Sequence, residues 1–543
     1  MTISGRAAAY ASAAVIGGIA VFLMLTWPTL CGSGGVFTYP QADLPTNLIG
    51  HLAFQDPGWH WPLLRAPRLG WPAGESIAMT DSNPALSIVA KLLAAVLRHA
   101  VNLFGVWLGL CFFLQPIGGV YLLRGFGVRN GVCGFNAWAA AVAMAILSLL
   151  LPAYLFRTNH INLMGQFLLL AALGLAVRNV RADRAPRFGR LLGFLSLAVL
   201  VHPYLFIFCA ITLMAPAVHL LVRRLPGARA AVREVLLAAQ LPIGLFLLLS
   251  YSLGGGGNGF GYYSTNLLSP VWPQISGLFG PNLPILNATG LQYEGFNYLG
   301  AGILLLLSTA LGCFIWQGAA ARKVAWRRQA GLILVLAALG FLALTPRVMV
   351  GHYQVLLFWF PGIDRLFSPV RASGRAIWVV DYAVIAASLA LLAAHLRPVM
   401  FGALLAMAVT LQWVDSGPLR HRAQHYFAGA GQTPPPLTLP AATQVFRAVH
   451  PCEKIENPTI DTYRLLALRQ GIALADVRLA HPMLDEVCRA TLAQGLTMKL
   501  APGEVRLFLP GAALRADPSK LGAGVQCSTG PAGLLCVLEP KPG

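Results

Sequence analysis

The sequence predicts a mainly α-helical protein, a polytopic transmembrane bundle of about 11 spans followed by a small C-terminal α/β domain outside the cytoplasm. The 543 residues are 57% hydrophobic and only 11% charged, with a mean hydropathy of +0.67. A soluble protein carries about twice that charge. Apolar runs of roughly 17–25 residues recur along the chain, which is the length that crosses a bilayer. After residue 413 the composition changes, and ten of the nineteen acidic residues lie there.

Each apolar run is interpreted as a membrane helix, with edges accurate to a few residues. The expected spans cover about residues 7–30, 103–123, 131–153, 160–178, 190–202, 204–222, 233–252, 299–317, 329–346, 377–395 and 398–413. We therefore divide the chain into a transmembrane domain, 1–413, and an extracytoplasmic α/β domain, 414–543. The first domain has a long first outer loop, 31–102, and a second outer loop, 254–298. The first run is too long for a signal-peptide core, so we expect it to remain as an anchor.

Basic residues set the expected orientation. Arginine-rich turns, such as the one from Arg178 to Arg190, occur at every second connection, whereas the loop 254–298 contains no Lys or Arg. The positive-inside rule then places the N-terminus in the cytoplasm and the C-terminus outside. The net charge of +20 reflects this topology, and no nucleic-acid-binding motif accompanies it. Nucleic acid is therefore not an expected partner, whereas membrane lipids are.

The segment 84–100 tests this scheme, because it is apolar enough to span a membrane. It contains Lys91, Arg98 and His99, and a crossing here would place every later arginine cluster outside. We therefore expect an amphipathic helix that lies on or dips into the outer interface.

The tail after residue 413 has the pattern of a small α/β domain. Helices are expected over 463–470 and 482–494, and strands over 504–509 and 533–538. The tail contains four cysteines, Cys452, Cys488, Cys527 and Cys536, and an even number suits two disulfides in an oxidising compartment. We favour Cys527 with Cys536 and Cys452 with Cys488, although four cysteines permit three pairings.

Acidic residues before the tail are few and unevenly placed. Of nine, seven lie in or next to segments assigned to the outer side, namely Asp43, Asp56, Glu75, Asp81, Glu294, Asp364 and Asp381. Carboxylates near hydrocarbon are costly, so their clustering on one side indicates a polar catalytic cavity there. Ordinary solvation of the loops is the alternative.

The first outer loop carries the leading catalytic candidate, Asp43. Asn47 and His51 follow at helical spacing and are expected to share a face with it as substrate-binding residues. Asp43 then acts as a general base on an acceptor hydroxyl or binds a cation. Alternatively, it only caps the helix that follows. Further along, Asp81 precedes Pro84; either Asp81 or Ser82 caps the next helix, or Asp81 is a second catalytic carboxylate.

Polar residues in the other outer connections are candidate ligand-binding groups. Arg157, Asn159 and His160 join two expected spans, and Arg371 and Arg375 precede another. A guanidinium at the mouth of a cavity binds a phosphate bidentately, and contact with lipid headgroups is the alternative. The remaining candidates lie in outer turns and in the lysine-free loop: His202, Tyr262, Tyr263, Tyr293 and Glu294. The density of Tyr, Asn, Gln and Glu in that loop resembles a surface for a neutral polyhydroxyl compound.

Several of these motifs resemble those of an uncharacterised group of bacterial polytopic proteins, known only as a domain of unknown function. The motifs are Asp43 with Gly50, Thr80-Asp-Ser-Asn-Pro, Gly261-Tyr-Tyr-Ser-Thr-Asn-Leu, Gln292-Tyr-Glu-Gly-Phe-Asn-Tyr and Ser373-Gly-Arg. The resemblance covers most of the chain, including part of the tail. In layout, the chain also resembles the GT-C superfamily of membrane glycosyltransferases, which have a long first outer loop with an early Asp and interfacial helices.

The GT-C resemblance implies transfer of a sugar from a polyprenyl-phosphate carrier to an envelope glycan, lipid or protein at the outer face of a bacterial inner membrane. Asp43 is then the catalytic carboxylate, and the tail is periplasmic. Many relatives carry a second acid beside the first, but Ala42 precedes Asp43 here. That difference leaves open whether a divalent cation acts as a cofactor. The competing functions are a transporter or flippase of an envelope lipid and a non-catalytic assembly protein.

Overall fold

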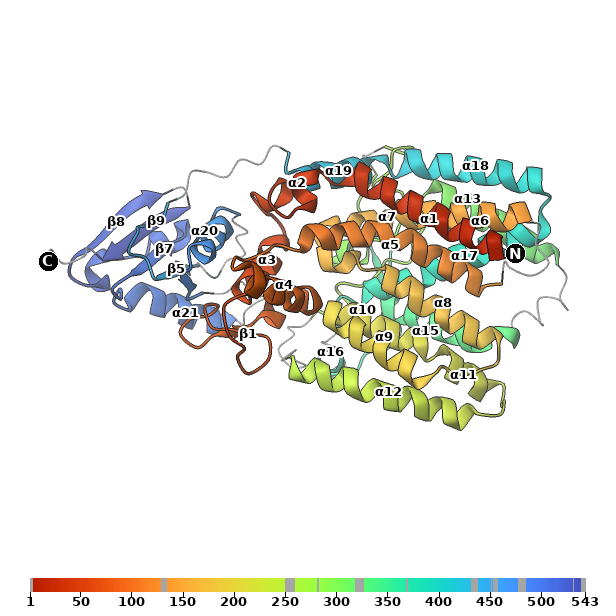
Figure 1. Cartoon of the computed structure of the whole chain (residues 1–543), viewed down its shortest axis with the longest axis horizontal. Coiled ribbons are helices and arrows are strands. Elements are labelled where there is room, and N and C mark those ends of the chain that lie inside the picture. Colours follow the sequence, from red (N-terminus) through yellow and green to blue (C-terminus); the bar gives the residue numbers. More distant parts are fainter. Residues whose placement is uncertain are drawn as a thin grey trace. The chain divides into compact units, whose positions relative to one another are not determined.

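The computed structural model describes most of the chain in helices and strands (Figure 1). The described residues are 3–127, 134–249, 259–280, 283–317, 327–367, 370–430, 438–450, 452, 458–476, 485–530 and 532–538. They fall into two compact units. The helical unit comprises Met1–Thr26, Trp107–Phe246 and Leu253–His425, and the mixed unit comprises Trp27–Val106, Leu247–Ser252 and Tyr426–Gly543. The first outer loop thus belongs with the tail, whereas the expected division ran at residue 413.

The helical unit is built from long apolar helices joined by short turns. Its helices are α1 (Ile3–Met24), α5 (Phe104–Gly125), α6 (Gly134–Leu150), α7 (Pro152–Leu155), α8 (Phe167–Arg181), α9 (Phe188–Val201), α10 (Pro203–Leu213), α11 (Ala215–Val222), α12 (Ala228–Leu248), α13 (Ala301–Trp316), α15 (Ala330–Leu344), α16 (Ile363–Leu366), α17 (Ile377–His395), α18 (Pro398–Asp415) and α19 (Gly417–Ala428). Short 3₁₀ turns connect them: η3 (Phe156–Asn159), η4 (Ile161–Met164), η5 (Gln292–Gly295) and η7 (Ser373–Ala376).

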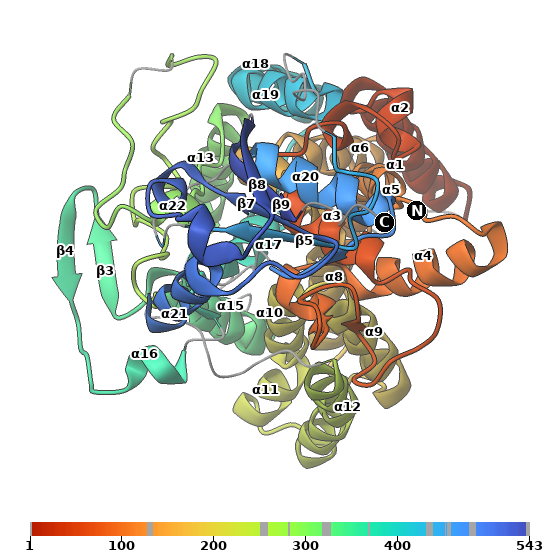
Figure 2. The same cartoon turned by 90° about the vertical axis from the view of Figure 1, so that its left-hand side faces the viewer.

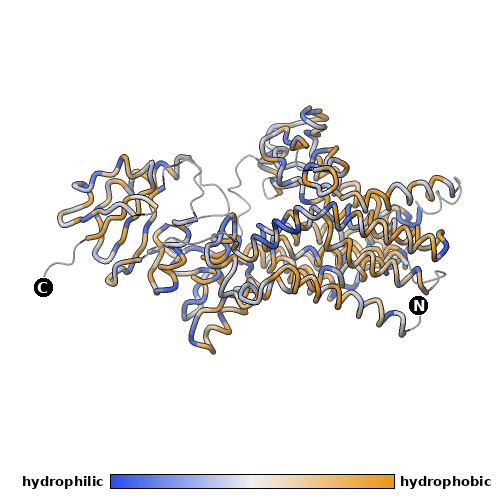
Figure 3. Tube along the Cα trace, turned by 90° about the horizontal axis from the view of Figure 1, so that it is seen from above, coloured by the Kyte–Doolittle hydropathy of each residue, from blue (hydrophilic) through white to orange (hydrophobic). Residues whose placement is uncertain are grey.

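Eight helical segments among the described residues are long and apolar enough to cross a membrane. Three further expected spans coincide with the shorter apolar helices α9, α13 and α15, of 14, 16 and 15 residues. The helices at the N-terminal end of the trace are mostly hydrophobic, with hydrophilic residues at intervals (Figure 3). The sequence therefore located the helices correctly, and the structure supports a polytopic membrane protein with at least the eight long segments.

Polar side chains cross-link helices inside this unit. The Tyr382 hydroxyl on α17 accepts a hydrogen bond from Gln115 Nε2 on α5, at 2.7 Å, and donates one to Gln166 Oε1, at 2.6 Å. All three side chains are buried. Hydrogen bonds between membrane helices contribute about 0.5–2 kcal/mol each. The contacts therefore fix α17 against two neighbours in addition to apolar packing.

The mixed unit joins the first outer loop to the tail. The loop forms α2 (Trp27–Leu30), η1 (Gly35–Phe37), α3 (Leu44–Ala53), a small sheet of β1 (Arg65–Ala66) and β2 (Glu75–Ser76), η2 (Ile77–Thr80) and α4 (Pro84–Leu97). The tail contributes β5 (Val445–Val449), α20 (Pro458–Arg469), β6 (Ala473–Leu474), α21 (Asp485–Thr497), β7 (Glu504–Phe508), α22 (Pro510–Ala513), η8 (Pro518–Leu521), β8 (Val525–Gly530) and β9 (Gly533–Leu538).

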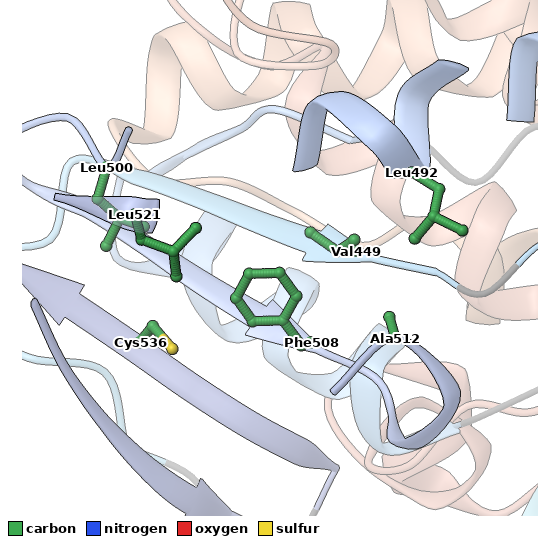
Figure 4. Packing of buried hydrophobic residues seen from close by; sticks show 7 residues of the cluster. All are labelled: Val449, Leu492, Leu500, Phe508, Ala512, Leu521 and Cys536. Carbon is green, nitrogen blue, oxygen red and sulfur yellow. The ribbon is translucent and has the colours of Figure 1, made fainter. Parts of the chain in front are cut away.

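The tail strands form one five-stranded sheet in the order β6-β5-β7-β9-β8. The first three strands are parallel, and β9 is antiparallel to both β7 and β8. An apolar core lies between the sheet and its helices, with Phe508 of β7 at its centre (Figure 4). Val449, Leu492 and Ala512 belong to the same buried cluster as Phe508. The predicted helices and strands of the tail are confirmed as α20, α21, β7 and β9.

Two disulfides close the tail, Cys452–Cys488 and Cys527–Cys536. They are the pairs that the sequence favoured. Cys527 and Cys536 face each other across β8 and β9, and Cys536 is fully buried in the core. The second disulfide therefore fixes the register of the outer hairpin of the sheet.

Helix α4 is amphipathic, as the segment 84–100 predicted. Its Lys91 is buried, and Nζ donates hydrogen bonds to the carbonyls of Phe54, at 2.8 Å, and Asp56, at 2.6 Å. On the opposite face an apolar stripe is exposed at helical spacing, formed by Val89, Leu92, Leu93, Val96 and Leu97. Lys91, whose charge was a reason to expect no membrane crossing here, thus lies inside the mixed unit and binds carbonyls at the C-terminal end of α3.

Candidate functional site

Three of the motifs that carried the resemblance pack against one another in the helical unit. The Gly374 amide donates to the carbonyl of Tyr263, at 3.1 Å, and Thr265 Oγ1 donates to the carbonyl of Gly295, at 2.5 Å. A Cβ added at Gly374 would lie 2.7 Å from the Cα of Gly295. Glycine is therefore required where the segments 261–267, 292–298 and 373–375 cross.

A single carboxylate binds two arginines at this crossing. Glu294 Oε2 accepts hydrogen bonds from Arg157 Nη1, at 2.6 Å, and from Arg375 Nη2 and Nε, at 2.8 and 3.1 Å. His160 Nε2 lies 3.7 Å from Glu294 Oε1. The side chains of Arg157 and Glu294 are 0% and 7% exposed. Burial alone would raise the pKa of Glu294, but Arg375 and Arg157 outweigh it and hold the pKa well below its usual range.

Arg157 and Arg375 therefore already bind a carboxylate of the protein itself, that of Glu294. Arg157 Nη2 also donates to the carbonyl of Glu294, at 2.5 Å, and its guanidinium lies between the rings of Phe156 and Trp378, 5.3 Å from each centroid. Arg375 lies over the ring of Tyr204 at 4.8 Å. A phosphate at either arginine must compete with Glu294. These two residues thus act first as a clamp that fixes the loops over the helix ends.

Arg371 and Arg347 have similar environments, because each guanidinium lies near an aromatic ring. The guanidinium of Arg371 lies 5.7 Å from the ring of Tyr263, and that of Arg347 lies 5.4 Å from Tyr262 and 4.5 Å from Trp359. Both arginines are half-buried, and in the part of the chain that the structure describes neither has a salt bridge. Two successive tyrosines of one loop therefore each hold an arginine whose charge is not neutralised by a carboxylate.

Sequence reasoning missed Arg347 and Trp359. Arg347 directly follows the expected span 329–346, in a connection that the arginine pattern assigns to the outer side, and basic residues are scarce there, which was a usable indication. Sequence reasoning also passed over Asp415, which accepts from Tyr298 OH and from the Ala301 amide, each at 2.7 Å. Asp415 ties the end of the lysine-free loop to α18. Asp381, counted only among the outer acids, accepts a hydrogen bond from Asn297 at 3.2 Å.

The other two motifs converge in the mixed unit. Asn47 Nδ2 donates to the carbonyls of Asp81, at 2.8 Å, and Thr80, at 3.3 Å, and Ser82 Oγ donates to the carbonyl of Asn47, at 2.7 Å. A Cβ added at Gly50 would lie 2.0 Å from Thr80 Oγ1. Asn47 thus organises the turn beside α3, and its amide nitrogen is used for that purpose.

Asp43 occupies the N-cap position of α3, but its side chain makes no capping hydrogen bond to the helix. The carboxylate is half-buried. The alternative that Asp43 caps the helix through its side chain is therefore not supported.

His51 serves the interior of the mixed unit. It is fully buried, its Nδ1 lies 2.9 Å from Ser87 Oγ, and the Leu103 amide donates to its Nε2 at 3.4 Å. Burial lowers the pKa of His51 from 6.5 to about 4, so the ring is neutral at physiological pH. These contacts give His51 a packing role, whereas the sequence suggested a face shared with Asp43.

The expected cap of α4 was wrong. Asn83 is the N-cap residue, and its Oδ1 accepts from the Leu86 amide at 3.1 Å. Asp81 instead ends η2 with a left-handed backbone, φ +54°. The reason is geometric, because Pro84 occupies the first helical position and the residue before it must be extended.

The candidate residues are distributed over both units. Asp43, Asn47, His51 and Asp81 belong to the mixed unit, whereas Arg157, Asn159, His160, His202, Tyr262, Tyr263, Tyr293, Glu294, Arg371 and Arg375 belong to the helical unit. Asn159 lies half-buried at the end of η3, and His202 caps α10 by accepting from the Tyr204 amide at 3.1 Å. Among the described residues, no group of three or more His, Cys, Asp or Glu side chains is placed to hold a metal ion.

The apolar helices and the loop motifs clamped at their ends fit a polytopic membrane protein with a strand-containing C-terminal region. The chain belongs to the family described as Domain of unknown function (DUF6311), which matches residues 14–417. The match includes all five motifs and ends at residue 417, so the expected extension into the tail is limited to its first few residues. No curated protein matches the chain.

Proposed function

We propose that this protein is a GT-C-type membrane glycosyltransferase that moves a sugar from a polyprenyl-phosphate carrier to an envelope acceptor at the outer face. The observation that carries the proposal is the pairing of Arg347 with Tyr262 and Trp359 and of Arg371 with Tyr263. A guanidinium is the group that binds phosphate oxygens bidentately, and an aromatic face packs against a sugar ring. The two kinds of group meet here around the loop that carries Tyr262 and Tyr263.

Each part of the site has a proposed role. Asp43 deprotonates or orients the acceptor hydroxyl. Glu294 holds Arg157 and Arg375 in place, so that the loops over the helix ends are rigid before substrate arrives. Whether a divalent cation takes part is decided by assay in the presence of Mg²⁺ and of EDTA.

The proposed location is the bacterial inner membrane, with the N-terminus in the cytoplasm and the tail in the periplasm. The alternation of arginine-rich turns supports this orientation. The two tail disulfides suit an oxidising compartment. The exposed apolar stripe of α4 supports a helix lying in the outer interface, with Arg98 next to it at headgroup level.

The test is sugar transfer by the full-length protein in lipid nanodiscs. The probes are radiolabelled polyprenyl-phosphate hexose and polyprenyl-phosphate pentose, with an envelope extract as acceptor. Asp43→Asn is expected to lower turnover by roughly 10²–10⁴-fold, because an amide cannot accept the acceptor's proton. The matched control is Asp517→Asn, which removes a partly exposed acid of the same unit and is expected to leave turnover unchanged. Near-normal transfer by Asp43→Asn contradicts the assignment of Asp43 as the base.

A transporter of an envelope lipid is the second candidate, because the buried contact between Gln115, Tyr382 and Gln166 places polar groups within apolar helices. That function predicts movement of labelled carrier lipid across liposome membranes without any loss of its sugar. It also predicts that Asp43→Asn leaves this movement intact. A non-catalytic assembly protein is expected to show neither activity.

A further inference from the structure

A hairpin projects from the helical unit between α15 and α17. It consists of β3 (Arg347–Val350) and β4 (Tyr353–Leu356), which pair antiparallel, and α16 follows it (Figure 2). The sixteen residues from 348 to 363 contain no Lys, Arg, Asp or Glu. A connection of this length without charge is unusual for a loop that meets water on all sides.

The hairpin and the residues after it expose apolar side chains in a continuous run. All four residues of β4 are exposed. Tyr353 is 79% exposed, Leu357 57% and Phe358 49%. An exposed apolar surface of this kind marks a site of contact with a membrane, a ligand or another protein.

The hairpin is held in a defined position by the loop that carries the tyrosines. Asn266 binds its turn twice, because Nδ2 donates to the Gly351 carbonyl at 2.7 Å and Oδ1 accepts from the Gly351 amide at 3.0 Å. The Leu267 amide donates to the Met349 carbonyl at 2.8 Å. The apolar surface is therefore part of the same rigid body as Tyr262 and Tyr263.

Arg347 is the first residue of β3 and pairs with Leu356 of the exposed strand β4. A Cβ added at Gly261 would lie 3.7 Å from Arg347 Cδ, and one at Gly259 would lie 3.3 Å from Arg371 Cβ. The two arginines thus flank a stretch of five residues, 259–263. Their charges contrast with those of Arg157 and Arg375, which Glu294 neutralises. In the described part of the chain, neither Arg347 nor Arg371 has a salt bridge, and each lies near an aromatic ring.

We propose that Arg347 and Arg371 bind the phosphate of a single lipid whose hydrocarbon chain lies along the exposed face of β4 and residues 357–360. Charge complementarity and the apolar strip, whose Leu356 pairs with Arg347 across the hairpin, select this occupant, an anionic amphiphile with a long chain. The inference rests on the proposed function, because it identifies the lipid with the polyprenyl-phosphate donor. It also places the donor's phosphate at a different pair of arginines from the pair held by Glu294.

The binding test uses the full-length protein in detergent and measures lipid retention by native mass spectrometry and by titration. The probes are polyprenyl phosphate, the corresponding polyprenol, phosphatidylglycerol and inorganic phosphate. Polyprenyl phosphate is expected to bind best, and loss of one charged hydrogen-bonding partner is expected to weaken it by roughly 10–100-fold. Arg347→Gln and Arg371→Gln are therefore each expected to show that loss.

The matched control is Arg420→Gln. Arg420 also lies over an aromatic ring, Trp413 at 3.6 Å, but it is in α19 and remote in sequence from the hairpin. It is expected to bind polyprenyl phosphate normally. Leu357→Ser with Phe358→Ser tests the chain-binding strip, and both side chains are exposed, so the fold tolerates the change. This double variant is expected to bind polyprenyl phosphate more weakly than the wild type and to bind inorganic phosphate as the wild type does.

The outcomes separate the inference from the proposed function. If phosphatidylglycerol binds as tightly as polyprenyl phosphate, the hairpin contacts bulk lipid. If inorganic phosphate binds as tightly, the hydrocarbon chain of the lipid contributes nothing to affinity. Either result overturns the inference. Normal binding by both arginine variants overturns it as well. Selective, arginine-dependent binding without sugar transfer upholds the lipid site and defeats the glycosyltransferase proposal. Transfer that persists in both arginine variants at wild-type affinity upholds the transferase and defeats the lipid site.

Discussion

Replacing Glu294 with Gln is expected to destabilise the helical unit more than any comparable surface change. The substitution keeps the size of the side chain and removes its charge. Two guanidiniums are left facing an amide, and one of them, Arg157, has a fully buried side chain. The three arginine hydrogen bonds to Oε2, at 2.6, 2.8 and 3.1 Å, lose their charge-assisted character together.

The magnitude follows from burial. Breaking a buried ion pair by removing one partner costs about 3–5 kcal/mol, because the remaining charge stays desolvated. Glu294 serves two arginines, so the upper part of that range is expected. An exposed pair is worth only ~0–1 kcal/mol. Glu234→Gln is the matched control, since Glu234 lies 3.9 Å from Arg233 and their side chains are 29% and 70% exposed.

The assay is thermal unfolding of the detergent-solubilised protein at neutral pH, followed by tryptophan fluorescence. Glu294→Gln is expected to lower the melting temperature by roughly 5 °C, and Glu234→Gln by about 1 °C or less. Equal, small shifts for the two variants would refute the view that Glu294 clamps the loops.

The pH dependence of the wild-type protein gives an independent check on Glu294. Its pKa in the folded protein is lowered, so the unfolded chain binds the proton more readily. The stability it contributes is present above its ordinary value of 4.5 and is lost only as the pH falls through the lower folded value. The difference in melting temperature between wild type and Glu294→Gln is therefore expected to stay constant from pH 8 to pH 6. A difference that disappears in that range contradicts an ionised, paired Glu294.

Two further changes test the mixed unit. Burial lowers the pKa of His51 to about 4, so the unfolded chain binds one more proton than the folded chain between pH 4 and 6.5. The free energy of unfolding therefore falls on acidification through this window, by up to ~1.4 kcal/mol per pH unit. His51→Gln should flatten this pH profile, whereas His60→Gln, at an exposed histidine, should not. Gly50→Ala is expected to cost ~1–3 kcal/mol, because the new methyl group would lie 2.0 Å from Thr80 Oγ1. Gly18→Ala, where nothing lies within 4 Å, is the control, and a Gly50→Ala protein as stable as wild type would show that α3 and η2 can separate.

The helices could be predicted from the sequence because a membrane helix is determined locally. About twenty apolar residues in succession satisfy the bilayer whatever their neighbours do. The strands β7 and β9 were also found, since the two segments either alternate polar with apolar residues or are rich in residues that favour strands. By contrast, β5 and the hairpin of β3 and β4 were not found. The hairpin is apolar without alternation, and its identity depends on Asn266, more than 80 residues earlier in the chain.

The candidate site was predicted only in part, for a related reason. Sequence reasoning selected Arg157, Glu294 and Arg375 as separate ligand-binding residues. They bind one another instead, across sequence separations of 137 and 81 residues. Composition shows that a buried charge needs a partner, but it does not show which one. The partner is decided by the crossing of the three glycine-containing loops, which is a property of the fold.

This pairing weakens one inference from the sequence, namely that the clustering of acids on the expected outer side indicates a catalytic cavity. Glu294 is explained by its two arginines, and Asp56 by a salt bridge to Arg68, with 2.6 Å between Arg68 Nε and Asp56 Oδ2. Both are structural, so clustering alone is weaker evidence for catalysis than the sequence suggested. The proposal of catalysis therefore depends on the outcome of Asp43→Asn and not on the clustering of the acids. It depends equally on Arg347 and Arg371, each of which lies near an aromatic ring and has no salt bridge within the described part of the chain.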